Sequence, residues 1–259
     1  MKTPDGARLV TDPDELEAFY SDRRAAHVYA LVDLEEPFWE GSSWFRRDDA
    51  VAGVVALPNG EGLAVYSVST KDPEGSAELV CELAPDLPTG LLITGPSHVE
   101  TALEQVRPIV RMGPHVRYEL TDPSAVPEPR ADLVTLGPDD EAEVQALYDS
   151  DPGAAFFLPH MLADRSFVGV RVDGVLVAAA GTHVLSERQR VAAIGAVYTR
   201  PDHRGRGHGE AVTAGVVHQL AGRIDVVALN VHADNAAART IYERIGFSPI
   251  LDYAEAELA

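Results

Sequence analysis

The 259-residue sequence has a single cysteine, Cys81. One cysteine cannot form an intramolecular disulfide, which excludes the disulfide-stabilised secreted class. Cys81 lies in the apolar stretch AELVCELAP with no base near it in the sequence, so we expect a buried packing residue and not a nucleophile. The nine histidines and the acidic residues show no His-x-x-x-His or cysteine pairing, so we expect no metal site.

Long apolar runs and basic residues are also scarce. No run approaches the roughly 18 apolar residues of a membrane helix, and the N-terminal stretch MKTPDGARLV lacks the apolar core of a secretory signal. The chain has 41 Asp and Glu against 21 Lys and Arg, a net charge of -20. This excess disfavours nucleic-acid and membrane partners, because both present negative charge. We therefore expect a cytoplasmic protein, monomeric or homodimeric.

The remaining composition is that of a globular protein, with 46% hydrophobic and 24% charged residues. The stretch ELTDPSAVPEPRADLV, residues 119–134, has three prolines and several charges and is typical of a linker. It predicts two domains, residues 1–128 and residues 129–259.

The second half of the chain has clear periodic patterns. Apolar spacing and turn residues predict a helix in 137–150, two strands in 166–186 joined at Asp173–Gly174, a strand at 191–199, a helix at 209–222, a strand at 226–233, a helix capped by Asp234 or Asn235 and ended by Gly246, and a final extended run. A hairpin implies antiparallel neighbours, while the helices between later strands imply crossovers. The fold class is therefore α/β with a mixed sheet.

The first half is less clear. We expect strands at 27–34, 51–57, 62–69 and 91–95, and helices at 12–27 and 97–109. This is again an α/β pattern, and we find no catalytic motif in it.

The most informative stretch is VYTRPDHRGRGHGEA, residues 197–211, which is basic in an acidic protein. Alternating glycines at 205, 207 and 209 lead from a strand into a helix, so backbone N–H groups at the helix start can approach an anion closely. A Walker loop needs a lysine, and the only lysines are Lys2 and Lys71. The glycine spacing and the position of Asp225 also disagree with the dinucleotide fingerprint. A phosphate-bearing ligand of another kind is expected.

Two separated motifs carry a family resemblance. VYTRPDHRGRGHG, with Arg204, Gly207 and Gly209, followed by NVHADNAAARTIYERIGF, with Asn235 and Tyr242, resembles the GNAT superfamily of acyl-CoA-dependent N-acyltransferases. Together with AGTHVLS and AAIGAVYT, these stretches resemble its FR47-like subgroup, which includes glycine N-acyltransferase-like proteins. The resemblance covers about residues 133–259. The first half resembles a degenerate copy of the same fold in its element order.

The resemblance implies a co-substrate, acetyl-CoA or another acyl-CoA, and direct transfer of the acyl group to a primary amine of a small molecule or amino acid. It implies an acyl-CoA site formed by Val197, Tyr198, Thr199, Arg204, Gly205, Arg206, Gly207, His208, Gly209, Asn230, Asn235 and Tyr242. Backbone N–H groups of Val197–Thr199 would polarise the thioester carbonyl, and Tyr242 would protonate the leaving thiolate.

The base that deprotonates the amine is the open point. Many members of the family have a Glu on the strand before the loop, but VAAIGAVYT has no carboxylate. His183 in the preceding strand is our candidate, since imidazole titrates near neutrality, and a water relay is the alternative. The missing carboxylate leaves a second hypothesis, a catalytically weak acyl-CoA sensor. Segment 154–162, AAFFLPHML, either lines the acceptor pocket or packs the core.

Overall fold

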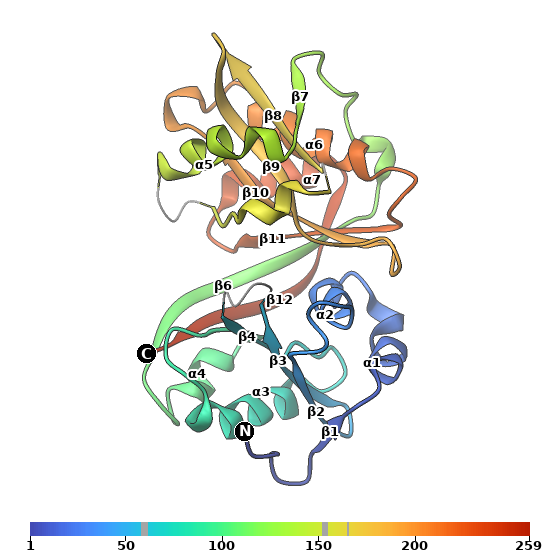
Figure 1. Ribbon diagram of the computed structural model, residues 1–259, viewed down its shortest axis with the longest axis vertical. Helices are drawn as coiled ribbons and strands as arrows, with labels where there is room; N and C mark the ends of the chain where they lie inside the picture. The colour runs from blue at the N-terminus through green and yellow to red at the C-terminus, as the bar shows by residue number, and fades with distance from the viewer. Residues whose placement is uncertain (58–61, 152–154, 165) are drawn as a thin grey trace. The chain divides into compact units, whose positions relative to one another are not determined.

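The computed structural model describes residues 1–57, 62–151, 155–164 and 166–259. It divides into two compact units (Figure 1). Unit 1 comprises Met1–Arg117, Val231–Asp234 and Ile250–Ala259, and unit 2 comprises Tyr118–Asn230 and Asn235–Pro249. The predicted domain boundary after residue 128 lies within unit 2, which begins at Tyr118, and stays a prediction.

Unit 1 is built from strands and helices in alternating groups. Its elements are β1 Arg8–Val10, α1 Pro13–Tyr20, α2 Val28–Asp33, β2 Ser43–Arg47, β3 Ala50–Ala56, β4 Leu63–Tyr66, α3 Pro73–Leu83, β5 Leu92–Pro96, α4 Val99–Leu103 and most of β6 Ile109–Leu120. Strands β1 to β4 pair antiparallel in sequence order, and β4 pairs parallel with β5. The last residues of β12 (Phe247–Leu258) pair antiparallel with β5.

Unit 2 repeats this order. Its elements are β7 Leu133–Leu136, α5 Glu141–Asp149, β8 Phe167–Val172, β9 Val175–Ser186, β10 Val191–Thr199, α6 His208–Leu220, most of β11 Val226–His232, α7 Ala236–Arg244 and the start of β12. Strands β7 to β10 pair antiparallel in order, and β10 pairs parallel with β11 through the crossover helix α6. Each unit is therefore an α/β unit with a mixed sheet, as predicted.

Helices cover both faces of the unit 2 sheet, as two neighbouring residues of β8 show. Neighbouring residues of a strand point to opposite faces of the sheet. Phe167 packs in a buried cluster with Val144 and Leu147 of α5. The next residue, Val168, lies against α6, where a Cβ on Gly215 would come within 3.1 Å of it.

Most of the second-half predictions are confirmed. The strand predicted at 191–199 is β10, the hairpin turns at Asp173–Gly174, and Asn235 caps α7. The segment after β6 contains one short 3-10 turn, Pro123–Ala125, before β7, and that it links two domains stays a prediction. None of the described helices combines the length and the apolar character that crossing a membrane requires.

Several first-half expectations are wrong or incomplete. The helix expected at 12–27 ends at Tyr20, and the helix expected at 97–109 spans only Val99–Leu103. Residues 27–34, predicted as a strand, contain helix α2. Four of its six residues are buried, namely Val28, Ala30, Leu31 and Val32. A short helix that is buried on most sides has no alternation of apolar and polar residues, so its sequence cannot be told from that of a buried strand. Cys81 on α3 is only partly buried, and burial raises the pKa of its thiol.

Candidate functional site

The loop between β10 and α6 has the backbone form that the glycines predict. Gly205 and Gly207 have φ angles of 74° and 76°, in the left-handed region that favours glycine. A Cβ placed on either residue would meet nothing within 4 Å. The space in front of both residues is therefore open, and their backbone is accessible to a ligand.

Helix α6 begins without a side-chain cap. Its N-cap residue is Gly207, and the first intrahelical bond runs from the Ala211 N–H to the Gly207 carbonyl at 3.0 Å. The N–H groups of residues 208–210 precede this bond and point out of the helix end, where the helix dipole adds partial positive charge. This end of α6 can hold an anion such as a diphosphate.

Two arginines are held at the loop by backbone oxygens. Arg204 Nε donates to the Thr199 carbonyl at 3.1 Å, and its guanidinium lies 3.6 Å from Asp151. Arg206 donates to the Asp202 carbonyl at 3.2 Å. The side chain of Arg204 is 57% exposed, so its charge is available to a ligand in solution.

His208, the first residue of α6, is buried and does not face solvent. Neither ring nitrogen has a hydrogen-bond partner among the residues the structure describes. Burial, with Arg130 as the next cause, lowers the pKa of His208 and favours a neutral ring. A buried imidazole lacking a partner beside an uncapped helix start fits a polar ligand better than a solvated turn.

Strand β10 is irregular where the acyl group is predicted to lie. Its ladder with β11 runs from Val191 to Ile194, so the residues from Gly195 onward lie beyond these pairs. Its register with β9 shifts between Gly195 and Tyr198. Ala196 has φ of 51°, a conformation that an alanine adopts only when its surroundings hold it. This is a β-bulge directly before Val197.

His183 lies across this bulge. The Ala196 N–H donates to His183 Nε2 at 3.0 Å, and the ring covers Gly195, where a Cβ would come within 2.3 Å of it. Burial lowers the pKa of His183, which favours the neutral ring that can accept this bond. The Phe156 carbonyl lies 3.2 Å from the same nitrogen, and the two contacts require opposite protonation of Nε2. The Ala196 contact is the shorter of the two, and it requires the neutral tautomer in which Nε2 carries no proton. That His183 is the base stays a prediction.

Tyr242 and Asn235 occupy helix α7. The Tyr242 ring is buried beside Tyr118 and Phe247, and burial raises the pKa of Tyr242 to about 12. Asn235 caps α7, its Oδ1 accepting the Ala238 N–H at 3.1 Å. Asn230 lies near the end of β11 and is partly buried. Their roles toward acyl-CoA stay predictions.

The sequence analysis missed Tyr148. Its hydroxyl donates to the Ala196 carbonyl at 2.6 Å, and its ring stacks on Phe157. No local pattern singles out this residue, since a tyrosine on the buried face of a helix reads as a packing residue. Of segment 154–162, residue 154 lies outside the described residues. Phe157 packs against the core beside Tyr148 and Phe167, whereas Phe156 is exposed.

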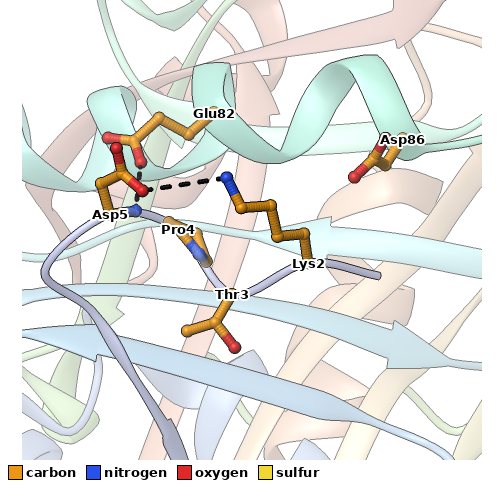
Figure 2. A pocket seen from close by; sticks show the side chains of 6 residues that line it. All are labelled: Lys2, Thr3, Pro4, Asp5, Glu82 and Asp86. Carbon is orange, nitrogen blue, oxygen red and sulfur yellow. Dashed lines mark hydrogen bonds and ion pairs between the residues drawn. The ribbon is translucent and has the colours of Figure 1, made fainter.

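A hollow lies in unit 1 between the N-terminal segment and α3 (Figure 2). It is lined by Lys2, Thr3, Pro4, Asp5, Glu82 and Asp86. Lys2 lies 3.9 Å from Asp5, whose backbone N–H donates to Glu82. Three carboxylates against one ammonium make this hollow unsuited to a diphosphate. Among the described residues, no group of three His, Cys, Asp or Glu is placed to hold a metal.

Residues 168–255 match the family model of FR47-like proteins. A stretch of 85 residues is 39% identical to the mycothiol acetyltransferase of Streptomyces griseus, covering 32% of this chain. The chain matches only 27% of that relative's length.

Solved structures share the fold. A Drosophila protein aligns over 99% of both chains with a TM-score of 0.71 at 18% identity. A GNAT-family acetyltransferase from Novosphingobium aromaticivorans covers 80% of this chain and 87% of its own, with a TM-score of 0.58 at 24% identity. A tandem GNAT protein from the clavulanic acid biosynthesis pathway aligns over 98% of both chains, with a TM-score of 0.53 at 16% identity. Residues 168–255 therefore match the FR47-like family, and the chain shares its fold with these solved structures.

Proposed function

We propose that this protein transfers an acyl group, in the first place acetyl, from acyl-CoA to a primary amine. The observation that carries the proposal is the uncapped start of α6 behind two left-handed glycines. The space there is open, the N–H groups of residues 208–210 precede the first intrahelical bond, and two arginines flank the loop. These groups suit the diphosphate of coenzyme A.

In the proposed reaction, the amine nitrogen attacks the thioester carbonyl carbon and forms a tetrahedral oxyanion. The Val197 N–H follows the bulge on β10 and would donate to this oxyanion. A single donor of this kind contributes about 3 kcal/mol to lowering the barrier. The carbon–sulfur bond then breaks, the oxyanion returns to a carbonyl, and the amide product forms with loss of the nitrogen's proton.

The leaving thiolate needs a proton or a hydrogen bond. Tyr242, with a pKa of about 12, remains protonated at neutral pH and can supply either. The ammonium of the acceptor must lose a proton before attack; a water relay would take it, or His183 if its Nε2 released the Ala196 N–H. The relative named mycothiol acetyltransferase supports a small-molecule acceptor.

The first test is calorimetric titration of acetyl-CoA, followed by thiol release across a panel of amines and amino acids. We expect binding with the wild-type protein and turnover with at least one amine. The Tyr242→Phe variant should retain binding and lose about 100-fold in kcat. Absence of binding would reject the proposal.

Two observations support the sensor hypothesis. Strand β10 has no carboxylate, and the Nε2 lone pair of His183 is used by the Ala196 amide. A sensor would bind acetyl-CoA, release no thiol with any amine, and be indifferent to Tyr242→Phe.

A further inference from the structure

The bulge on β10 is held from two sides by side chains of other elements. Strand pairing leaves one extra residue on β9 at His183, because the neighbours Ala193 and Ile194 pair with Val184 and Thr182. A second shift follows between Gly195 and Tyr198. The extra residue of the first irregularity therefore contacts the second, through the bond from the Ala196 N–H to His183 Nε2.

The Ala196 carbonyl is held independently. Tyr148, from helix α5, donates its hydroxyl to this oxygen at 2.6 Å, and its side chain is buried against Phe157 and Tyr198. Burial raises the pKa of Tyr148, so the hydroxyl keeps its proton and acts as a donor throughout the physiological range. Both polar backbone groups of Ala196 are thus bonded to side chains, the N–H to His183 of β9 and the carbonyl to Tyr148 of α5.

This contact fixes more than Ala196. The carbonyl of Ala196 and the N–H of Val197 belong to one planar trans peptide unit and point in opposite directions. A hydrogen bond that fixes the carbonyl therefore fixes the direction of the Val197 N–H. That N–H is the donor that the proposed function assigns to the oxyanion.

We infer that Tyr148 and His183 are positioning residues that orient the Val197 N–H toward the thioester carbonyl. Tyr148 fixes the plane of the 196–197 peptide, and His183 holds the left-handed backbone of Ala196 (φ 51°) from the other side. A donor oriented before the reaction stabilises the oxyanion without reorganisation when charge develops. The inference rests on the proposed function, and it gives His183 a task that needs no proton transfer.

The test is Tyr148→Phe, which removes one hydroxyl and keeps the ring. The matched control is Tyr66→Phe in unit 1, where a buried tyrosine also donates to an alanine carbonyl, that of Ala26, at 3.3 Å. Tyr148→Phe loses the bond to Ala196, whereas Tyr66→Phe loses the bond to Ala26 and also contacts with His27 and Arg117, so the control should show at least as large a decrease in Tm. Only Tyr148→Phe should lower kcat, by about tenfold, while the Kd for acetyl-CoA stays within about twofold of wild type.

The decisive readout is the infrared stretch of the thioester carbonyl in bound acetyl-CoA carrying a carbon-13 label, measured without an amine. A donor aimed at the oxygen lowers this frequency in the wild type, and we expect the lowering to shrink in Tyr148→Phe and remain in Tyr66→Phe. A purely structural role of Tyr148 would leave the frequency unchanged. His183→Ala is the second variant, should Tyr148→Phe fail to fold, and should reduce the lowering in the same way.

The outcomes separate the two proposals. If acetyl-CoA does not bind to the wild type, the proposed function and this inference both fail. If it binds and is turned over while Tyr148→Phe and His183→Ala keep the wild-type frequency, the inference is overturned and the function stands. A changed frequency in His183→Ala cannot arise from loss of a base, because no amine is present.

Discussion

The two units contain the same crossover but begin its helix differently. In each, two parallel strands are joined by a helix: β4–α3–β5 in unit 1 and β10–α6–β11 in unit 2. Helix α3 starts after Asp72, whose carboxylate accepts the Gly75 N–H at 2.9 Å. Helix α6 starts after Gly207, which has no side chain to offer.

The loops differ in the same way. In unit 1, Ser69 donates to the Asp49 carbonyl, Thr70 contacts His27 at 3.1 Å, and Lys71 donates to the Phe19 carbonyl. A Cβ on Gly75 would come within 2.3 Å of Asp72 Oδ2. In unit 2 the corresponding space before Gly205 and Gly207 is open.

One topology can therefore be closed or open to an anion at the same point. The acidic cap of α3 satisfies a free N–H group and complements the helix dipole, which leaves no reason for an anion to bind there. At the start of α6, Gly207 has no side chain, so a bound anion would have to accept the free N–H groups and complement the helix dipole. The N-cap residue is one part of this difference, and the loop glycines and the flanking arginines of unit 2 are the others; together they account for placing the proposed site in unit 2 alone.

The largest expected effect concerns His27 of unit 1, which contacts Thr70 in the loop before α3. Burial lowers the pKa of His27 to about 3, so between pH 3 and about 6.5 the unfolded chain binds the proton more tightly. The contribution of the neutral His27 ring to the free energy of unfolding is fully present above about pH 6.5. It decreases as the pH falls toward 3, by about 5 kcal/mol in all. Urea unfolding at several pH values measures it. His27→Gln should flatten this dependence, and His218→Gln, at an exposed position of α6, should not; a steep slope in His27→Gln would contradict the assignment.

The second prediction places an acidic N-cap residue, like the one that begins α3, at the start of α6. In Gly207→Asp, a carboxylate occupies the start of α6 and repels the diphosphate, so the Kd for acetyl-CoA should rise roughly 100-fold or more. Gly207→Asn is the matched control, because asparagine has the same shape, tolerates the left-handed backbone and has no charge. Calorimetric titration should show a much smaller loss for it. Equal affinities for the two variants would mean that charge at the cap is irrelevant.

The smallest effect is the reverse change. Asp72→Ala removes the cap of α3 and should lower the free energy of unfolding by about 1 kcal/mol. Affinity for acetyl-CoA should be unchanged, because unit 1 has neither the glycines nor the flanking arginines of the unit 2 loop. Denaturant unfolding and calorimetry measure the two quantities, and a second acetyl-CoA site in this variant would show that the cap alone kept unit 1 closed.

The sequence predicted the elements of unit 2 well because its signals are local. Glycines stop α6 and α7, an Asp–Gly pair turns the β8–β9 hairpin, and the loop glycines precede a helix. The segment of α2 lacked such signals, and its buried residues resemble a strand. The role of Tyr148 could not be predicted, since it depends on a bulge that brings the Ala196 carbonyl within reach of α5.

The division of the chain has a consequence for how the protein is made. Residues Tyr253–Glu257 of β12 pair with Leu92–Pro96 of β5, yet the ribosome adds them after every residue of unit 2. Until then, one edge of β5 has no β12 beside it, for roughly 10 s or longer at ordinary elongation rates. The first unit to emerge is therefore the one that must wait for the last strand, and a chain halted before residue 250 leaves its sheet open for pairing with another chain.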